Sequence, residues 1–246
     1  MVTVSRIAIL GFIGVVWHLM SHSTSANILP SPSETWAAAL RLWSTGMLAQ
    51  ALGQSLTVYA TGFSIACLIG VIAGLLMGVL KPLGKALEVF VFALAATPRV
   101  AFIPLIIVTL GLGIKAKVFV VFLGAVMPIL INTYAGVLAA DKDLIEMARS
   151  LGADRVKIVL QIILPGALPF VVTGLRLGAT IGLINVVVAE LYTAIGGLGG
   201  LLALYGNTFR MAEYFVIVLT LAAIGMCITE ALRHIEARIG RWRSHA

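Results

Sequence analysis

Residues 55–80 read SLTVYATGFSIACLIGVIAGLLMGVL, a stretch of 26 positions without a charged side chain. A helix needs about 20 apolar residues to cross the hydrocarbon core of a bilayer, so this stretch can span it once. The whole chain of 246 residues has the same character, with 61% hydrophobic residues, 11% charged residues and a mean hydropathy of +1.09. A soluble domain typically has about 25% charged residues and could not bury so much apolar surface. We therefore expect an integral membrane protein.

Four similar runs follow along the chain, and a shorter one opens it at residues 7–20. The four long runs cover residues 86–110, 118–140, 167–194 and 214–232. Because all these runs are continuous rather than alternating, they predict helices and not the strands of a barrel. The predicted fold class is an all-α integral membrane protein with about six transmembrane helices. The first run could instead be a signal peptide cleaved near Thr24, Ser25 and Ala26, which would leave five spans.

The distribution of Lys and Arg predicts the orientation of these helices. With the N-terminus inside, the outer segments would contain only Arg41, Lys115, Lys117 and Arg210, whereas eleven basic residues would lie in the cytoplasmic segments. Cationic residues accumulate on the cytoplasmic side of membrane proteins, so both termini are predicted to be cytoplasmic. The net charge of +7 is then explained by orientation and does not indicate binding to nucleic acid.

Patterns typical of enzymes and metal sites are weak. Five residues rather than the required four separate Gly78 from Gly84, and Ala86 stands where a phosphate-binding loop needs Ser or Thr for magnesium. His18 and His22 lie one helical turn apart, but no carboxylate or cysteine motif accompanies them, so we expect no metal site. We expect the chain to catalyse no reaction and to contain no catalytic residues or cofactor of its own.

Residues 141–165 are polar enough to leave the membrane, yet their pattern is helical. Asp141 or Asp143 can cap a first short helix, and Gly152 is a natural stop for it. Asp154 can cap a second helix, which we expect to end at Pro165. Apolar residues recur at helical spacing in both, Leu144, Met147, Ala148 and Leu151 in the first and Val156, Val159, Leu160 and Ile163 in the second. These stripes could cover the ends of the spanning helices, or they could dock a partner.

Several residues of this loop have the spacing of a known motif. They are Glu146, Ala148, Gly152, Ile162, Leu164 and Pro165. This pattern resembles the EAA loop of ABC-importer permeases, from which Met147 is a mild departure because methionine is also a good helix former. The resemblance covers nearly the whole chain and is greatest for the nitrate/sulfonate/taurine-type permeases. It also rests on residues 29–33, 96–101, 103–105, 110–113, 174–177, 188–190 and 197–199, in that order.

The resemblance implies a fold like that of type I ABC importer permeases, in a bacterial or archaeal inner membrane. Three regions follow: a first transmembrane helix at residues 1–26, which could be a signal anchor, an outer segment at 27–54, and a permease core at 55–246. Partners implied by the family are the lipid bilayer, a second permease copy, an outer solute-binding protein and two ATPase subunits that bind ATP and magnesium. The loop would couple to these ATPases through Leu144, Glu146, Met147, Ala148, Arg149, Leu151, Gly152, Ile162, Leu164 and Pro165.

Ionisable residues within the spans are the candidates for a translocation path, because charges in lipid usually face a bundle interior or water. Arg99 directly follows Thr97 and Pro98, which predicts a broken helix with a cation at depth. Arg99 could line the path or could neutralise Glu190. Arg176 could also line the path, or its side chain could reach the membrane surface. We expect the Glu88 side chain to reach the membrane surface. Arg176 and Glu190 are about 21 Å apart along a helix and cannot pair directly.

The sequence therefore predicts a permease that imports a small solute, and Arg99 would suit an anion. The resemblance implies a solute like nitrate, a sulfonate or taurine, or a small heterocyclic compound. One alternative is a proton-coupled secondary transporter that uses an intramembrane carboxylate such as Glu190, although we find no internal repeat typical of that class. The other is a membrane-embedded enzyme, but the sequence has no recognisable cluster of His, Asp and Glu residues that would form an active site. The glycine-rich segment at residues 196–207 is expected to be a loop, with close packing at a helix end as the alternative.

Overall fold

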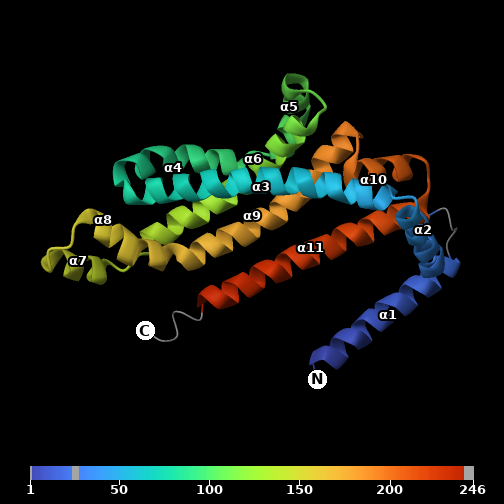
Figure 1. The fold of residues 1–246 in the computed structure, drawn as a ribbon, viewed down its shortest axis with the longest axis horizontal. Helices are drawn as coiled ribbons and strands as arrows, with labels where there is room; N and C mark the ends of the chain where they lie inside the picture. The colour runs from blue at the N-terminus through green and yellow to red at the C-terminus, as the bar shows by residue number, and fades with distance from the viewer. Residues whose placement is uncertain (1, 24–27, 241–246) are drawn as a thin grey trace. The chain divides into compact units, whose positions relative to one another are not determined.

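The computed structural model describes the backbone of residues 2–23 and 28–240, and the side chains of Ile9, 11–23 and 28–234. These residues form helices joined by short turns, and no strand occurs among them. The elements, drawn in Figure 1, are α1 (Val2–Ser23), α2 (Pro32–Ser44), α3 (Met47–Val79), α4 (Lys81–Ala96), the 3₁₀ helix η1 (Arg99–Phe102), α5 (Ile103–Leu110), α6 (Ile114–Leu138), α7 (Lys142–Ser150), α8 (Arg155–Ile158), the π-helix η2 (Val159–Ile163), α9 (Leu164–Thr193), α10 (Gly197–Asn207) and α11 (Met211–Gly240).

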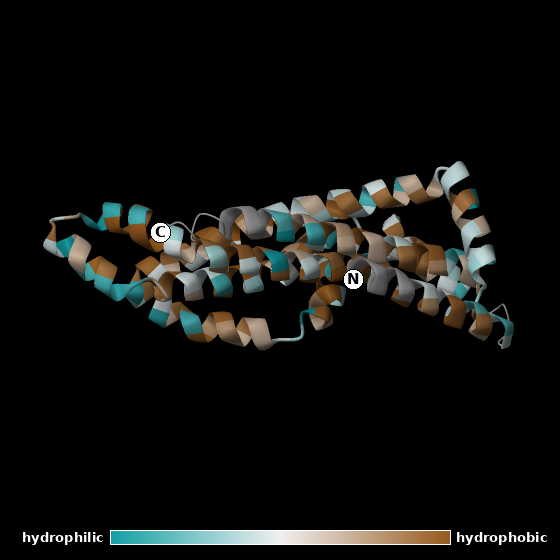
Figure 2. Cartoon of the chain, turned by 90° about the horizontal axis from the view of Figure 1, so that it is seen from below, coloured by the Kyte–Doolittle hydropathy of each residue, from teal (hydrophilic) through white to brown (hydrophobic). Residues whose placement is uncertain are grey.

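Two compact units make up the chain. The first combines residues 1–56 with 190–224, and the second combines 57–189 with 225–246. Figure 2 shows hydrophobic residues along the long helices and hydrophilic residues gathered on α7 and α8. This distribution agrees with the predicted all-α membrane fold.

Among the described residues, four helices are long and apolar enough to cross a bilayer: Met47–Val79, Ile114–Leu138, Arg155–Thr193 and Met211–His234. A fifth span results if Lys81–Ala96 and Arg99–Leu110, which meet at 83°, count as one. The break falls at Thr97 and Pro98, as predicted. The remaining predicted span, residues 7–20, is helical within α1, but several of its side chains and the possible cleavage site at 24–26 lie outside the described residues.

Pro165 does not end a short helix, so this prediction was wrong. The helix that starts at Arg155 continues through η2 into α9 and runs without a break to Thr193, over 39 residues. Proline lacks an N–H and its ring collides with the carbonyl four residues earlier in an α-helix. The wider π-turn accommodates it, because there the N–H of Leu164 donates to the oxygen of Val159, five residues back.

The expected loop at residues 196–207 is also wrong, since Gly197–Asn207 form the helix α10. Glycine is a poor helix former, but several of these glycines are buried and lie close to other groups. Residues 27–54 contain the helix α2, and α3 begins at Met47, before the predicted start at residue 55.

A stripe of small residues brings α3 against α6 within the second unit. Gly62, Ala66, Gly70, Gly74 and Gly78 recur every four positions and therefore share one face of α3. A Cβ atom at Gly62, Gly70, Gly74 or Gly78 would lie within about 3 Å of Val121, Ile129, Thr133 or Val137 respectively, and Ala66 packs with Ala125. The matching period on α6 allows close backbone contact along residues 62–78, which is how helices associate in lipid.

We expect Gly74→Leu to destabilise the second unit, by about 3 kcal/mol or more, because overpacking forces two helices apart. A Cβ at Gly74 would lie 2.7 Å from both the Leu130 oxygen and the Thr133 Cβ. The matched control is Gly53→Leu on the same helix, where a Cβ meets nothing within 4 Å. Thermal unfolding of the purified variants in detergent measures the difference, and equal midpoints for the two variants would contradict the packing.

Candidate functional site

The helix α7 is positioned by a cap at Asp141, the residue before its first turn. The Asp141 carboxylate accepts hydrogen bonds from the N–H groups of Asp143 and Leu144, at 2.9 and 3.2 Å. Asp141, and not the alternative Asp143, is therefore the N-cap. Arg149 lies in the last turn, where a cation interacts favourably with the helix dipole.

A sharp turn at Gly152 separates α7 from α8. Gly152 has φ +80°, a conformation that favours glycine. The N–H of Ala153 donates to the Ala148 oxygen at 2.9 Å, and the N–H of Gly152 donates to the Arg149 oxygen at 3.0 Å, which together make a Schellman motif. Asp154 then caps α8 by accepting from the N–H of Lys157 at 2.7 Å. The predicted helix–turn–helix is present at these residues.

The two predicted apolar stripes differ in how far their side chains are exposed. On the first helix Leu144, Met147 and Leu151 are 45%, 56% and 82% exposed, so this chain does not cover them. On the second helix Val156 and Leu160 are exposed and Val159 and Ile163 are half-buried, while Ile158, which lies outside the predicted stripe, is buried. The exposed edge of α7 favours the docking hypothesis over the idea that these residues cover helix ends.

The remaining coupling candidates lie around this turn. Glu146 and Met147 are exposed on α7, and Ala148 accepts the bond of the Schellman motif. Ile162 and Leu164 are half-buried, and Pro165 is exposed at the start of α9.

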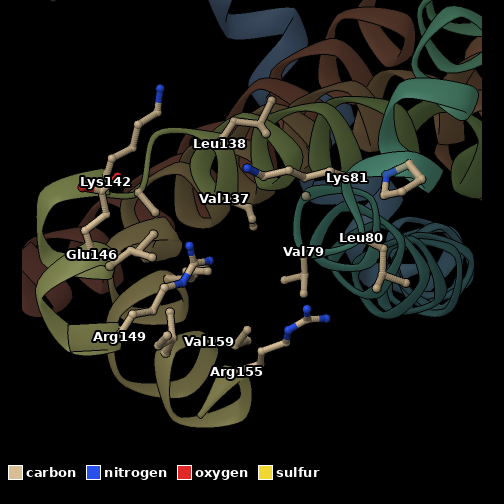
Figure 3. Close-up of a pocket in the computed structure, with 16 residues that line it drawn as sticks. Val79, Leu80, Lys81, Val137, Leu138, Lys142, Glu146, Arg149, Arg155 and Val159 are labelled. Carbon is tan, nitrogen blue, oxygen red and sulfur yellow. The ribbon is translucent and has the colours of Figure 1, made fainter. Parts of the chain in front are cut away.

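A pocket of about 840 Å³ lies beside α7 within the second unit. Its walls come from the α3–α4 turn, the end of α6, α7, α8 and η2. Its basic residues are Lys81, Lys142, Arg149 and Arg155, and Glu146 is its one acidic residue. Figure 3 shows Lys81, Arg149 and Arg155 extending toward the same opening from different elements. Glu146 and Arg149 are candidates from the sequence alone, but the pocket is not, because Lys81 lies more than sixty positions from them.

Glu190 is buried, at 1% exposure, and its carboxylate caps α10 within the first unit. It accepts hydrogen bonds from the Ser55 hydroxyl, at 2.8 and 2.9 Å, and from the N–H of Gly199 at 2.9 Å. Ser55 Oγ in turn accepts from the N–H of Leu198 at 2.8 Å, and Gln54 Oε1 accepts from the N–H of Gly197 at 2.7 Å. The first three N–H groups of α10 are thus satisfied by side chains from α3 and α9.

The other end of α10 is held by Arg210. Its guanidinium lies 4.9 Å from the Tyr205 ring centre and donates to Glu213 at 2.6 Å, while Arg41 lies 3.5 Å from the same carboxylate. The hydrogen bond to Glu213 raises the pKa of Arg210. Both ends of α10 are therefore anchored by side-chain contacts.

Arg99 follows the helix break in the second unit. Its guanidinium donates to the oxygens of Gly124 and Ala95, each at 3.2 Å. These carbonyls satisfy part of the guanidinium, so Arg99 does not need Glu190 as a partner. Arg176 is half-buried on α9, and Glu88 accepts from the Tyr134 hydroxyl at 3.5 Å.

Comparison with known proteins gives three findings. Residues 66–241 match the family described as binding-protein-dependent transport system inner membrane component. The chain is 36% identical over 230 residues to the putative aliphatic sulfonates transport permease protein SsuC of Escherichia coli (strain K12), over 92% of this chain and 87% of SsuC. It is 31% identical over 247 residues to the bicarbonate transport system permease protein CmpB of Synechococcus elongatus, over 95% of this chain and 86% of CmpB.

Among solved structures, an inward-facing form of the MetNI methionine ABC transporter superposes with a TM-score of 0.71 and 22% identity. The match covers 80% of this chain and 97% of that one. At this identity the likeness concerns the fold, which is that of type I importer permeases.

Proposed function

Because the chain belongs to the family of binding-protein-dependent transport inner membrane components, with the nitrate/sulfonate/taurine-type permeases as its relatives, we propose that it couples ATP hydrolysis by two partner ATPase subunits to solute import. It is an ABC importer permease of the inner membrane, which agrees with the predicted family, and such permeases are not themselves enzymes. ATP and magnesium bind to the partner ATPases. Both termini lie on the cytoplasmic side in this proposal, as does α7.

The observation that carries the proposal is the exposed apolar edge of a well-capped α7. Leu144, Met147 and Leu151 would enter a groove on the ATPase, and Glu146 and Arg149 would orient the contact through charges. Since α8 continues into α9 as one helix, displacement of the loop is transmitted into the membrane without a flexible joint. Closure of the two ATPases would therefore change the access of the path.

We propose a small anionic solute as the cargo. The relatives SsuC and CmpB are named for sulfonates and bicarbonate, both anions at neutral pH. Arg99 has five N–H donors, and two carbonyls occupy part of them, so donors remain for an anion that passes the helix break between Thr97 and Arg99. A second copy of the chain completes the path, and an outer binding protein delivers the solute. Arg176 is a further candidate to line the translocation path.

The proposal is tested by reconstituting the chain with the ATPases encoded beside it and measuring co-purification and ATP-dependent uptake. We expect Leu151→Asp to reduce both at least tenfold, because a carboxylate cannot enter an apolar groove without a large desolvation cost. Leu112→Asp, an exposed leucine between α5 and α6, is the control and should retain both. Uptake by the chain alone, driven by a proton gradient, would overturn the proposal in favour of secondary transport.

A further inference from the structure

The pocket beside α7 has more positive charge than the coupling role, which takes Glu146 and Arg149, accounts for. Lys81, Lys142, Arg149 and Arg155 line it with Glu146, so its lining has four positive charges and one negative charge. Within the part of the chain that the structure describes, none of these four cations forms an ion pair with a carboxylate. Cations that converge without an internal partner leave a site for an external anion.

The position of the pocket indicates what kind of anion fits. Its walls include Val79, Leu80, Val137 and Leu138, which lie at the ends of the spanning helices α3 and α6. The end of a span lies where the hydrocarbon core meets the lipid head groups. The lining therefore joins an apolar wall at the ends of the spans to cations from the α3–α4 turn, α7 and α8, as a lipid with an anionic head group requires.

We propose that this pocket binds the phosphate group of an anionic phospholipid. Lys81, Arg149 and Arg155 would donate to the phosphate oxygens, and the apolar wall at the ends of α3 and α6 would contact the glycerol and the first acyl carbons. Because the three cations belong to the α3–α4 turn, α7 and α8, one head group ties the loop to the spans. Free phosphate has the same oxygen chemistry but gains nothing from the apolar wall.

The test compares two double variants with equal charge loss. Lys81→Gln with Arg155→Gln removes two pocket cations, whereas Lys85→Gln with Lys157→Gln removes two exposed neighbours that do not line the pocket. The purified full chain is titrated with phosphatidylglycerol in phosphatidylcholine nanodiscs or mixed micelles. Retained lipid is counted by native mass spectrometry, and the thermal midpoint is recorded; a parallel arm adds inorganic phosphate to phosphatidylcholine alone.

For the wild type and the Lys85/Lys157 variant we expect phosphatidylglycerol to be retained and to raise the midpoint. For the Lys81/Arg155 variant we expect affinity to fall roughly 10- to 30-fold, since each basic residue contributes about 1 kcal/mol to attraction by anionic lipid. Equal losses in the two variants would overturn the proposal by showing diffuse surface attraction. If inorganic phosphate raised the thermal midpoint as much as phosphatidylglycerol does, the proposal of a lipid ligand would be overturned, because the ligand would then be a free anion.

Discussion

Gly152→Pro is expected to abolish ATP-dependent uptake in the reconstituted importer. Gly152 has φ +80°, whereas proline holds φ near −65°, so the turn between α7 and α8 cannot form as observed. Proline also removes the N–H that donates to the Arg149 oxygen at 3.0 Å. Forcing proline into the observed turn would cost about 3 kcal/mol. The loop therefore takes another conformation, in which α7 leaves the position that the ATPase must contact. Uptake and co-purification with the ATPases are the measurements.

Gly111→Pro is a matched control for this change. Gly111 has φ +78°, its N–H donates to the Ile107 oxygen at 2.8 Å, and a Cβ there meets nothing within 4 Å, as at Gly152. It lies between α5 and α6, at the end of α6 remote from α7. We expect this variant to assemble with the ATPases. If Gly152→Pro transported solute normally, or if both variants lost assembly equally, the turn would have no specific role in coupling.

Glu190→Ala is expected to lower the free energy of unfolding by about 3 kcal/mol or more, because buried donors lose their acceptor where no water can replace it. The N–H of Gly199 and the hydroxyl of Ser55 both donate to this carboxylate, which is 1% exposed. Glu190→Gln retains one acceptor oxygen, so the free energy of unfolding should fall less in this variant. Thermal unfolding of the purified variants measures both.

Glu88→Ala is the control for Glu190, since it removes another carboxylate from an apolar helix. Glu88 accepts one long hydrogen bond, 3.5 Å from Tyr134, so we expect a small change in the thermal midpoint. The opposite pattern, an unchanged midpoint for Glu190→Ala together with complete loss of uptake, would contradict the capping role. It would instead indicate a carboxylate that titrates during transport.

Local signals were sufficient to predict the helix–turn–helix at α7 and α8. The caps at Asp141 and Asp154 act on N–H groups two or three residues away, and the Gly152 turn closes within five residues. Interactions of such short range depend on neighbouring residues alone. The break after Thr97 was predictable for the same reason, because Pro98 removes a backbone donor wherever the helix packs.

Longer-range features could not be predicted in this way. A glycine-rich segment is a poor helix by propensity, yet α10 forms because Gln54 and Ser55 satisfy its first N–H groups from 143 positions earlier. The continuation of α8 into α9 past Pro165 depends on a π-turn, and no apolar pattern indicates one. The pocket likewise joins Lys81 to Arg149 and Arg155, which only the packing of α3 against α6 brings together.

The sequence by itself determined that this protein lies in a membrane and is helical. In residues 55–80, and in every similar run, backbone N–H and C=O groups have no water to bond and must bond within their own helix. Only the tertiary structure decided that Glu190 is a cap rather than a free intramembrane charge. Its role depends on Ser55, 135 positions away, and lipid favours whichever packing satisfies a buried carboxylate.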